Sequence, residues 1–147
     1  MSALVALQTR LRDALRGLPH LNGVPVLSEV EGDALAERDA SLAKKHLAVV
    51  VGAASFDPQS RDSRAITGRA RVVATVYEQP TRNRIGQSLV GPTVTSAAEC
   101  IACAAHLLPF EGGVLVFAGI GGVVRVDDRT VSRDVSFETL TTLTGEG

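Results

Sequence analysis

Leucines recur at three- and four-residue intervals at the start of the chain, with charged residues between them. A helix of about four turns with one apolar stripe produces this spacing. Gly17 and Pro19 predict where this helix ends. A short strand is expected over residues 24–30, and Pro25 favours an edge or a first strand position because proline lacks an N–H group. The leucines of the stripe are Leu4, Leu7, Leu11, Leu15 and Leu18.

A second helix and a buried strand are predicted next. Asp33 is the expected N-cap of a helix over residues 34–45, and the lysines that close this range suit the negative end of the helix dipole. Residues 47–54 form a continuous apolar run, which is typical of a strand covered on both faces. Residues 70–77 alternate between apolar and more polar side chains, a pattern that predicts a further strand.

The third predicted helix carries a capping signal and many small apolar residues. Ser96 with Glu99 three positions later forms a capping box, with Thr95 as the alternative cap, and Pro109 is expected to close the helix. The body of this segment, AECIACAAHLL, consists mostly of small residues. Such a helix can lie close to a sheet, so we expect it to be the most buried of the three.

Two apolar segments near the end, residues 114–126 and 131–139, are joined by a polar tetrad and predict an antiparallel hairpin. Strands outnumber helices and do not alternate strictly with them, which favours the α+β class. We therefore expect one α+β domain over residues 1–140, with a mixed, mostly antiparallel sheet of about five strands packed by about three helices. Residues 141–147 are expected to form a frayed tail.

Composition narrows the range of functions. The chain has 147 residues, of which 45% are hydrophobic, enough for the core of one domain. Its formal net charge is −1 and its basic residues are dispersed, so we expect no recognition of nucleic acid. No apolar run approaches the roughly 18 residues of a membrane span, and Gln8, Arg10 and Arg12 interrupt what would otherwise resemble a signal peptide. These features predict a cytosolic protein that contacts no membrane.

Cys100, Cys103 and His106 share roughly one face of the third predicted helix and are the weak metal candidates of the sequence. Two thiolates and an imidazole can bind Zn²⁺, but a structural site needs a fourth ligand, usually from a second element. His20 and His46 are isolated in the sequence. We therefore expect no metal and no cofactor, with the cysteines as small buried residues between helix and sheet.

Motifs for catalysis are missing from the sequence. The run Gly119-Ile120-Gly121-Gly122 resembles the start of a dinucleotide fingerprint, but the final glycine and the following helix are missing. A bulge or twist in a long strand is expected there instead. No Gly-x-Ser-x-Gly sequence occurs, and that motif would mark a nucleophilic serine. We expect no enzyme and assign no catalytic residue.

Two long polar segments, residues 55–68 and 78–91, lie between predicted strands. Connections of this length are uncommon in a compact domain and often contact a partner. Two interpretations stay open: mobile surface loops, or contacts between subunits. The second makes their polar side chains candidates for a subunit or tube interface, namely Asp57, Arg61, Asp62, Arg64, Glu78, Arg82, Asn83 and Arg84.

The stretch VYEQPTRNR at the end of one predicted strand is followed by the helical segment TVTSAAECIACAAHLL. Together with the order of elements along nearly the full chain, these segments resemble the tail terminator (tail completion) proteins of long-tailed bacteriophages and phage-tail-like particles. The resemblance implies a structural homo-oligomer with a tail-terminator-like fold, expected to be a hexameric ring. Such a ring sits on the last ring of the tail-tube protein, stops tube growth and offers a surface to the head connector protein.

The resemblance also implies a location in the neck of the virion tail, with assembly in the bacterial host cytoplasm. The family has no catalytic residues, and relatives with this order of elements serve elsewhere at the head–tail joint. Two other classes of function stay open. One is a small ligand-binding or regulatory domain whose helix 95–108 lines a pocket. The other is a small enzyme or metal protein that uses Cys100, Cys103 and His106.

Overall fold

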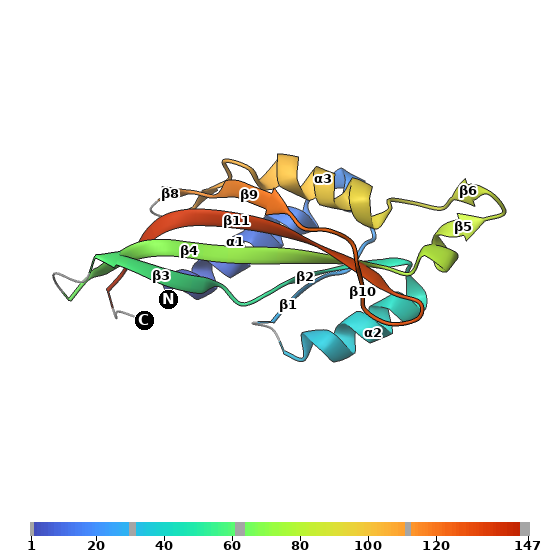
Figure 1. The fold of residues 1–147 in the computed structure, drawn as a ribbon, viewed down its shortest axis with the longest axis horizontal. Coiled ribbons are helices and arrows are strands. Elements are labelled where there is room, and N and C mark those ends of the chain that lie inside the picture. Colours follow the sequence, from blue (N-terminus) through green and yellow to red (C-terminus); the bar gives the residue numbers. More distant parts are fainter. Residues whose placement is uncertain (1, 30–31, 61–63, 111–112, 145–147) are drawn as a thin grey trace.

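Three helices and a mixed sheet of seven strands form the fold in the computed structural model, which describes residues 2–29, 32–60, 64–110 and 113–144 (Figure 1). The α+β class is confirmed, with more strands than the five or so expected. Two small two-stranded pairs complete the described part. The elements are α1 (Ala3–Arg16), a 3-10 turn (Pro19–Leu21), β1 (Val26–Ser28), α2 (Ala34–Lys44), β2 (Leu47–Val51), β3 (Ser55–Ser60), β4 (Ile66–Glu78), a second 3-10 turn (Pro80–Asn83), β5 (Arg84–Ile85), β6 (Ser88–Leu89), α3 (Val94–Ala105), β7 (Pro109–Phe110), β8 (Gly113–Val114), β9 (Val116–Ile120), β10 (Val124–Arg125) and β11 (Val131–Leu143).

Two long antiparallel strands, β4 and β11, form the centre of the sheet. They pair residue by residue from Val131 opposite Glu78 to Leu143 opposite Ile66. The strand order is β1-β2-β4-β11-β10, with β3 beside the first half of β4 and β9 beside the middle of β11. Because β1 and β2 are parallel and the other pairs are antiparallel, the sheet is mixed.

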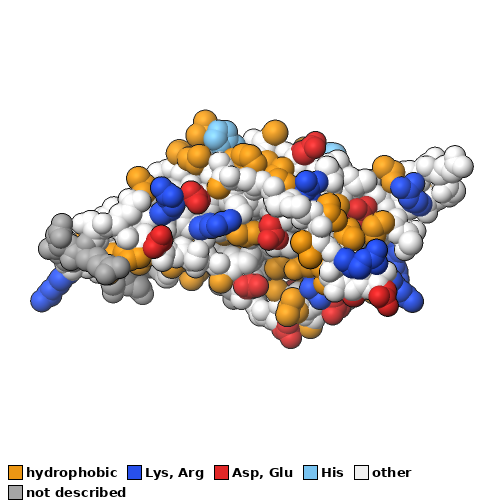
Figure 2. All heavy atoms as spheres, viewed as in Figure 1, with side chains coloured by type: hydrophobic (Ala, Val, Ile, Leu, Met, Phe, Trp, Pro, Cys, Tyr) orange, Lys and Arg blue, Asp and Glu red, His pale blue; other side chains and the backbone are white. Residues whose placement is uncertain are grey.

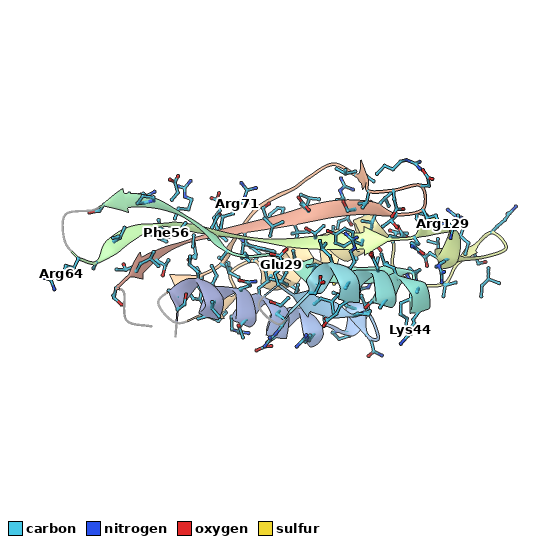
Figure 3. The ribbon with its side chains drawn as sticks, turned by 90° about the horizontal axis from the view of Figure 1, so that it is seen from below. Glu29, Lys44, Phe56, Arg64, Arg71 and Arg129 are labelled. Carbon is cyan, nitrogen blue, oxygen red and sulfur yellow. The ribbon has the colours of Figure 1, made fainter. Side chains whose placement is uncertain are left out.

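Alternate residues of β4 and β11 face α1 and α3, which cover one side of the sheet (Figures 1 and 3). The predicted leucine stripe of α1 supplies Leu7, Leu11 and Leu15 to this core, and β11 supplies Phe137. Burial of each large apolar side chain contributes about 1.5–3 kcal/mol relative to exposure. The helix–sheet core therefore lies on this one side, under the middle of the two long strands.

The strand β2 is buried on both faces, as its apolar sequence predicts. Leu47, Val49 and Val51 belong to the core beneath α1. Ala48 and Val50 are also buried, and they face the other side, where α2 contacts β2. On that side the Arg38 guanidinium lies 4.8 Å from the centre of the Tyr77 ring. The two helices α1 and α2 thus pack on opposite faces of the same end of the sheet.

Beyond α2, the face of β4 and β11 opposite α1 and α3 carries polar cross-strand contacts. Hydrogen bonds and a long ion pair join side chains of the two strands there. Contacts of this kind on an open face contribute little to stability, so this face forms no second core. The contacts are Arg71 to Ser136 at 3.0 Å, Thr75 to Asp134 at 2.8 Å, and Arg69 to Glu138 at 3.8 Å.

Residues 55–68, predicted as a polar loop, instead contain β3 and the start of β4. A close approach at Gly68 allows this pairing, because a Cβ atom there would lie 2.3 Å from the Asp57 carbonyl oxygen and 2.8 Å from the Phe56 ring. Phe56 in turn packs against the core. The sequence does not predict this strand, because β3 is mostly polar and contains a proline. We call β3 together with residues 66–71 the arm.

The strand β11 continues past the predicted end of the domain. Thr141, Thr142 and Leu143 pair with β4, so the prediction of a frayed tail is wrong for these three residues. The extension of β4 through the arm provides the backbone partner, and threonine is β-branched and suits a strand. Residues 145–147 lie outside the described residues.

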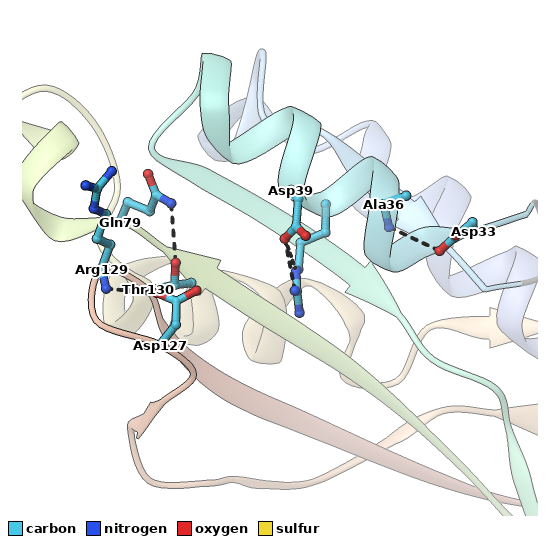
Figure 4. Close-up of polar contacts among 8 residues, drawn as sticks. Asp33, Ala36, Asp39, Gln79, Asp127, Arg129 and Thr130 are labelled. Carbon is cyan, nitrogen blue, oxygen red and sulfur yellow. Dashed lines mark hydrogen bonds and ion pairs between the residues drawn. The ribbon is translucent and has the colours of Figure 1, made fainter.

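Several local predictions near the N-terminus are confirmed. The helix α1 ends at Arg16, just before Gly17. The Asp33 carboxylate accepts a hydrogen bond from the Ala36 N–H over 3.1 Å at the start of α2 (Figure 4). The strand β1 lies at an edge of the sheet directly after Pro25.

The predicted capping box of α3 is wrong by one turn. The N-cap is Thr93, whose hydroxyl accepts from the Ser96 N–H, and the Ser96 hydroxyl accepts in return from the Thr93 N–H. The sequence does not reveal that a buried carboxylate binds the Val94 N–H and so fixes Val94 as the first helical residue. The helix ends at Ala105, before Pro109.

The predicted C-terminal hairpin is present as β9 and β10 against β11. The sequence predicts a bulge or twist in a long strand at residues 119–122, but the strand is interrupted there between β9 and β10. The bulge lies just before this run, at Ala118, which is left unpaired where the register shifts. In the turn, the N–H groups of Arg129 and Thr130 donate to the Asp127 carboxylate over 2.8 and 2.9 Å (Figure 4). The bonds from Arg129 and Thr130 hold the pKa of Asp127 below its ordinary value.

The close approach at Gly68 predicts a cost for any side chain there. We expect Gly68→Ala to lower the free energy of unfolding by about 1–3 kcal/mol, the usual effect of overpacking, measured by urea denaturation. Amide hydrogen exchange in β3 should become faster as well. The matched control is Gly122→Ala, because nothing lies within 4 Å of a Cβ atom at that position. Equal losses in the two variants would contradict the packing argument.

Candidate functional site

Residues 84–90 form a two-stranded hairpin that projects from one end of the sheet (Figure 1). We call this hairpin the finger. Its strands β5 and β6 pair Arg84 with Leu89 and Ile85 with Ser88. Gly86 begins the two-residue turn with a φ of 65°, a conformation that glycine adopts without strain. The second predicted polar loop therefore has regular structure at its tip.

The finger is rooted in a buried hydrogen-bond network centred on Glu78 and Asn83, which are 4% and 0% exposed. The Asn83 amide donates to Glu78 Oε2 over 2.9 Å and to the Pro92 carbonyl over 3.2 Å. Its own oxygen accepts from the Gly91 N–H over 2.8 Å. The other Glu78 oxygen accepts from the Val94 N–H over 2.9 Å, where the helix dipole favours a negative charge. The network joins the end of β4, both ends of the finger and the start of α3.

Further hydrogen bonds attach the same root to β2 and α2. His46 Nε2 donates to the Pro92 carbonyl over 3.0 Å, since a carbonyl can only accept. The Gln79 N–H donates to the His46 carbonyl over 2.8 Å. The Arg82 guanidinium donates to the Ala43 carbonyl at the end of α2, also over 2.8 Å. The base of the finger is thus fixed by several elements of the fold.

The tip of the finger exposes apolar side chains. Ile85, Leu89 and Val90 are 76%, 52% and 53% exposed. Burial of apolar surface stabilises a protein or a complex by roughly 25 cal/mol per Å², and the tip of the finger does not gain this free energy within the single chain. Apolar patches on a protein surface often mark interaction sites. The exposed Arg84 adds a positive charge, and apolar and basic atoms lie together at this end of the molecule in Figure 2. An apolar surface on a fixed base suits contact with another protein.

Two of the predicted interface residues are buried in the structure, and others lie at the surface. Glu78 and Asn83 are buried in the network and do not face a partner. Asparagine and glutamate are usually solvated, and only the fold reveals the groups that bind them here. Arg82 is exposed but bonded to α2, and Arg84 is exposed on the finger.

The other predicted interface residues belong to the opposite end of the molecule. Asp57 is exposed on β3, and Arg64 is exposed just before the β4 part of the arm (Figure 3). Arg61 and Asp62 lie outside the described residues. The two predicted groups of residues are therefore not brought together, and they occupy opposite ends of the long axis (Figure 1).

The third helix does not assemble a metal site from its described residues. Cys100 is half-buried and Cys103 is exposed, so the expectation that both are buried is wrong for Cys103. The apolar face of α3 carries Ala98 and Ile101 and turns Cys103 away from the sheet. Burial raises the pKa of the Cys100 thiol, which disfavours the thiolate that a metal needs. His106 Nδ1 accepts from the Phe117 N–H over 3.1 Å, and nowhere in the described part do three His, Cys, Asp or Glu residues form a group that could hold a metal ion.

Sequence reasoning missed the apolar residues of the finger. The polar and small residues of the segment RIGQSLVG predict a loop, yet the segment also contains three large apolar residues, Ile85, Leu89 and Val90. Apolar residues in a polar, glycine-containing segment with no helical or strand period were the available signal. A predicted core does not include these apolar residues, and apolar side chains are not favoured in water.

Comparison of the sequence with models of protein families and with curated proteins gives no match. Among the described residues, no helix combines the length and the apolar character needed to cross a membrane. The case for a function therefore depends on the geometry of the surface.

The buried network predicts a large effect for Asn83→Ala. The substitution removes the partner of Glu78 Oε2 and of the Gly91 N–H, and each buried group left unsatisfied costs about 1–3 kcal/mol. Urea denaturation should show this loss. Arg84→Ala, one residue along and exposed, is the control and should change stability by less than about 0.5 kcal/mol. A mild effect of Asn83→Ala would mean that the network does not hold the root.

Proposed function

We propose that this chain is a non-enzymatic, ring-forming subunit that caps a phage tail tube and joins it to the head connector, the role of the tail terminator proteins it resembles. The observation that supports this proposal most is the finger, an exposed apolar hairpin whose base is fixed in a buried network. A buried network that holds an exposed apolar tip stabilises a surface for a partner. In this proposal the partner is the next copy in the ring.

A closed ring requires a heterologous contact, in which one patch meets a different patch on the neighbour. The finger and the arm lie at opposite ends of the molecule (Figure 1), so copies arranged end to end bring one against the other. The finger exposes Arg84, and the arm exposes Asp57 together with Arg69 and Arg71. A contact between Arg84 and Asp57 would favour one register, with Arg69 and Arg71 outside that contact.

The ring would act in the neck of the virion, after assembly in the host cytoplasm. Its faces would bind the last ring of tail-tube protein and the head connector. The alternative is another head–tail joining protein that forms the same kind of ring. The two roles differ in which proteins bind the faces of the ring. A binding assay with the tail-tube and connector proteins encoded in the same genome separates these two roles.

The finger contact predicts that Ile85→Glu prevents assembly of the ring. A charge at this exposed position should leave folding intact, because Ile85 packs against no core, but it cannot be buried in an interface without a large loss of affinity. Light scattering should show oligomers for the wild-type chain and a smaller species for the variant. The two chains should give the same circular dichroism spectrum, which reports an intact fold. Tubes assembled from the tail-tube protein should stop at a defined length only with the wild-type chain.

The control is Leu35→Glu, a comparable change at an exposed leucine on α2. It should assemble like the wild-type chain. A wild-type chain that stays monomeric both in solution and on tail tubes, or an Ile85→Glu variant that assembles normally, would refute the finger contact.

A further inference from the structure

Most edges of the sheet carry a feature that blocks pairing with another strand. On β1, the Arg16 guanidinium donates to the Val26 carbonyl over 2.8 and 3.1 Å. On β3, Pro58 lacks an N–H group and a register shift leaves Gln59 unpaired. Bonded carbonyls, prolines and bulges are the means by which proteins prevent edge-to-edge association.

The edge of β9 is also covered, by the segment that follows α3. The Phe117 N–H donates to His106 Nδ1. The Leu115 carbonyl and N–H bond to Leu107 and Leu108 over 2.7 and 2.9 Å. At Leu115 the chain therefore turns away from β11 and towards the end of α3.

In the described part of the chain this turn leaves the last part of β11 without a paired strand on its outer side, although β8 lies close to β11 and Gly113 lies beside the Thr139 side chain. The pairing of β11 with β9 ends at Glu138, whereas its pairing with β4 continues to Leu143. Among the described residues, no strand pairs with the outer edge of residues 139–143. We call this segment the open edge.

The register shows which backbone groups of the open edge point outwards. The Asp134 carbonyl accepts from the Gly121 N–H on the β9 side. Because β11 pairs with β4 without a shift, every second residue after Asp134 points to the same side. The N–H and C=O groups of Leu140 and Thr142 therefore face outwards. Within the described part, the Leu140 carbonyl receives one long bond of 3.4 Å from the Thr139 hydroxyl.

The side chains of the open edge suit pairing with an identical segment. The sequence TLTTL has no charge, proline or glycine, and its β-branched residues favour strands. Leu140 is 57% exposed and Thr142 is exposed on the same face. Antiparallel pairing about Thr141 places Leu140 of each copy opposite Thr142 of the other, so no like charges meet.

We propose that the open edge pairs with the open edge of a second copy of this chain, antiparallel and centred on Thr141. Each Leu140–Thr142 pair then exchanges both of its N–H···O=C bonds. The two sheets become continuous across a twofold axis, and part of the exposed surface of Leu140 is covered. This contact is isologous and uses neither the finger nor the arm charges. It is independent of the proposed ring.

The test uses Ile85→Glu as the parent chain, so that a finger contact does not obscure the result. Sedimentation from about 10 µM to about 1 mM covers the affinities expected for a small interface. The parent should show a monomer–dimer equilibrium. Leu140→Lys in the same chain should raise the dissociation constant at least about tenfold, since an edge lysine opposes strand pairing. Gln59→Lys, on the blocked edge of β3, should leave it unchanged.

Amide hydrogen exchange provides a second measurement that a general effect on folding would not mimic. The Leu140 and Thr142 amides should exchange slowly in the dimer and rapidly in the Leu140→Lys chain, while the Thr141 amide, which faces β4, stays protected in both. Thr142→Pro, which removes one outward N–H group, should also abolish the dimer. A parent chain that is monomeric throughout, or a dimer that survives Leu140→Lys, would overturn the proposal. Protection that appears only when another protein is added would assign the open edge to that protein instead.

Discussion

The length of the β4–β11 pair sets the shape of this protein. Each strand has 13 residues, which span about 43 Å at about 3.3 Å per residue. The helix α1 has 14 residues and spans about 21 Å at 1.5 Å per residue. The helix α1 alone therefore covers only about half of the strand length. The arm and the open edge lie at the end of the strands that runs beyond α1, whereas the base of the finger lies at the other end, where α3 begins.

The hydrophobic pattern of the sequence predicted the helices and strands that bury the apolar side chains of their own segment. Examples are the leucine stripe of α1 and the apolar run of β2. In both, the sequence of the segment itself contains the signal. The strand β3 is different, because its pairing depends on the missing side chain of Gly68 in β4 and on backbone hydrogen bonds. The end of β11 likewise follows from the presence of the arm. Neither dependence leaves a periodic signal in the segment concerned.

The candidate site shows the same division. The sequence located the segment that carries the finger but assigned its importance to charged and amide residues. Glu78 and Asn83 act inside the fold, because a helix N-terminus and a loop backbone lie within hydrogen-bond distance of them. A buried polar group and a solvated one look alike in sequence. The stretch from Glu78 to Asn83, which carries much of the resemblance to tail terminators, is thus a structural anchor, and the exposed residues beyond it carry the proposed contact.

The two proposed contacts place a constraint on each other. A heterologous contact alone closes a ring with one axis, and an added isologous contact creates perpendicular twofold axes and two equivalent rings. A tube end presents one surface to a cap, so an assembly with two equivalent faces cannot have the connector on one face and the tube on the other. The proposed open-edge contact is small and uncharged and is therefore expected to be weak, and the tube is expected to strengthen the proposed finger contact by ordering the copies in a ring. We therefore expect pairing through β11 only in the free protein, and its loss on a tube would release the faces proposed to bind the neighbouring components.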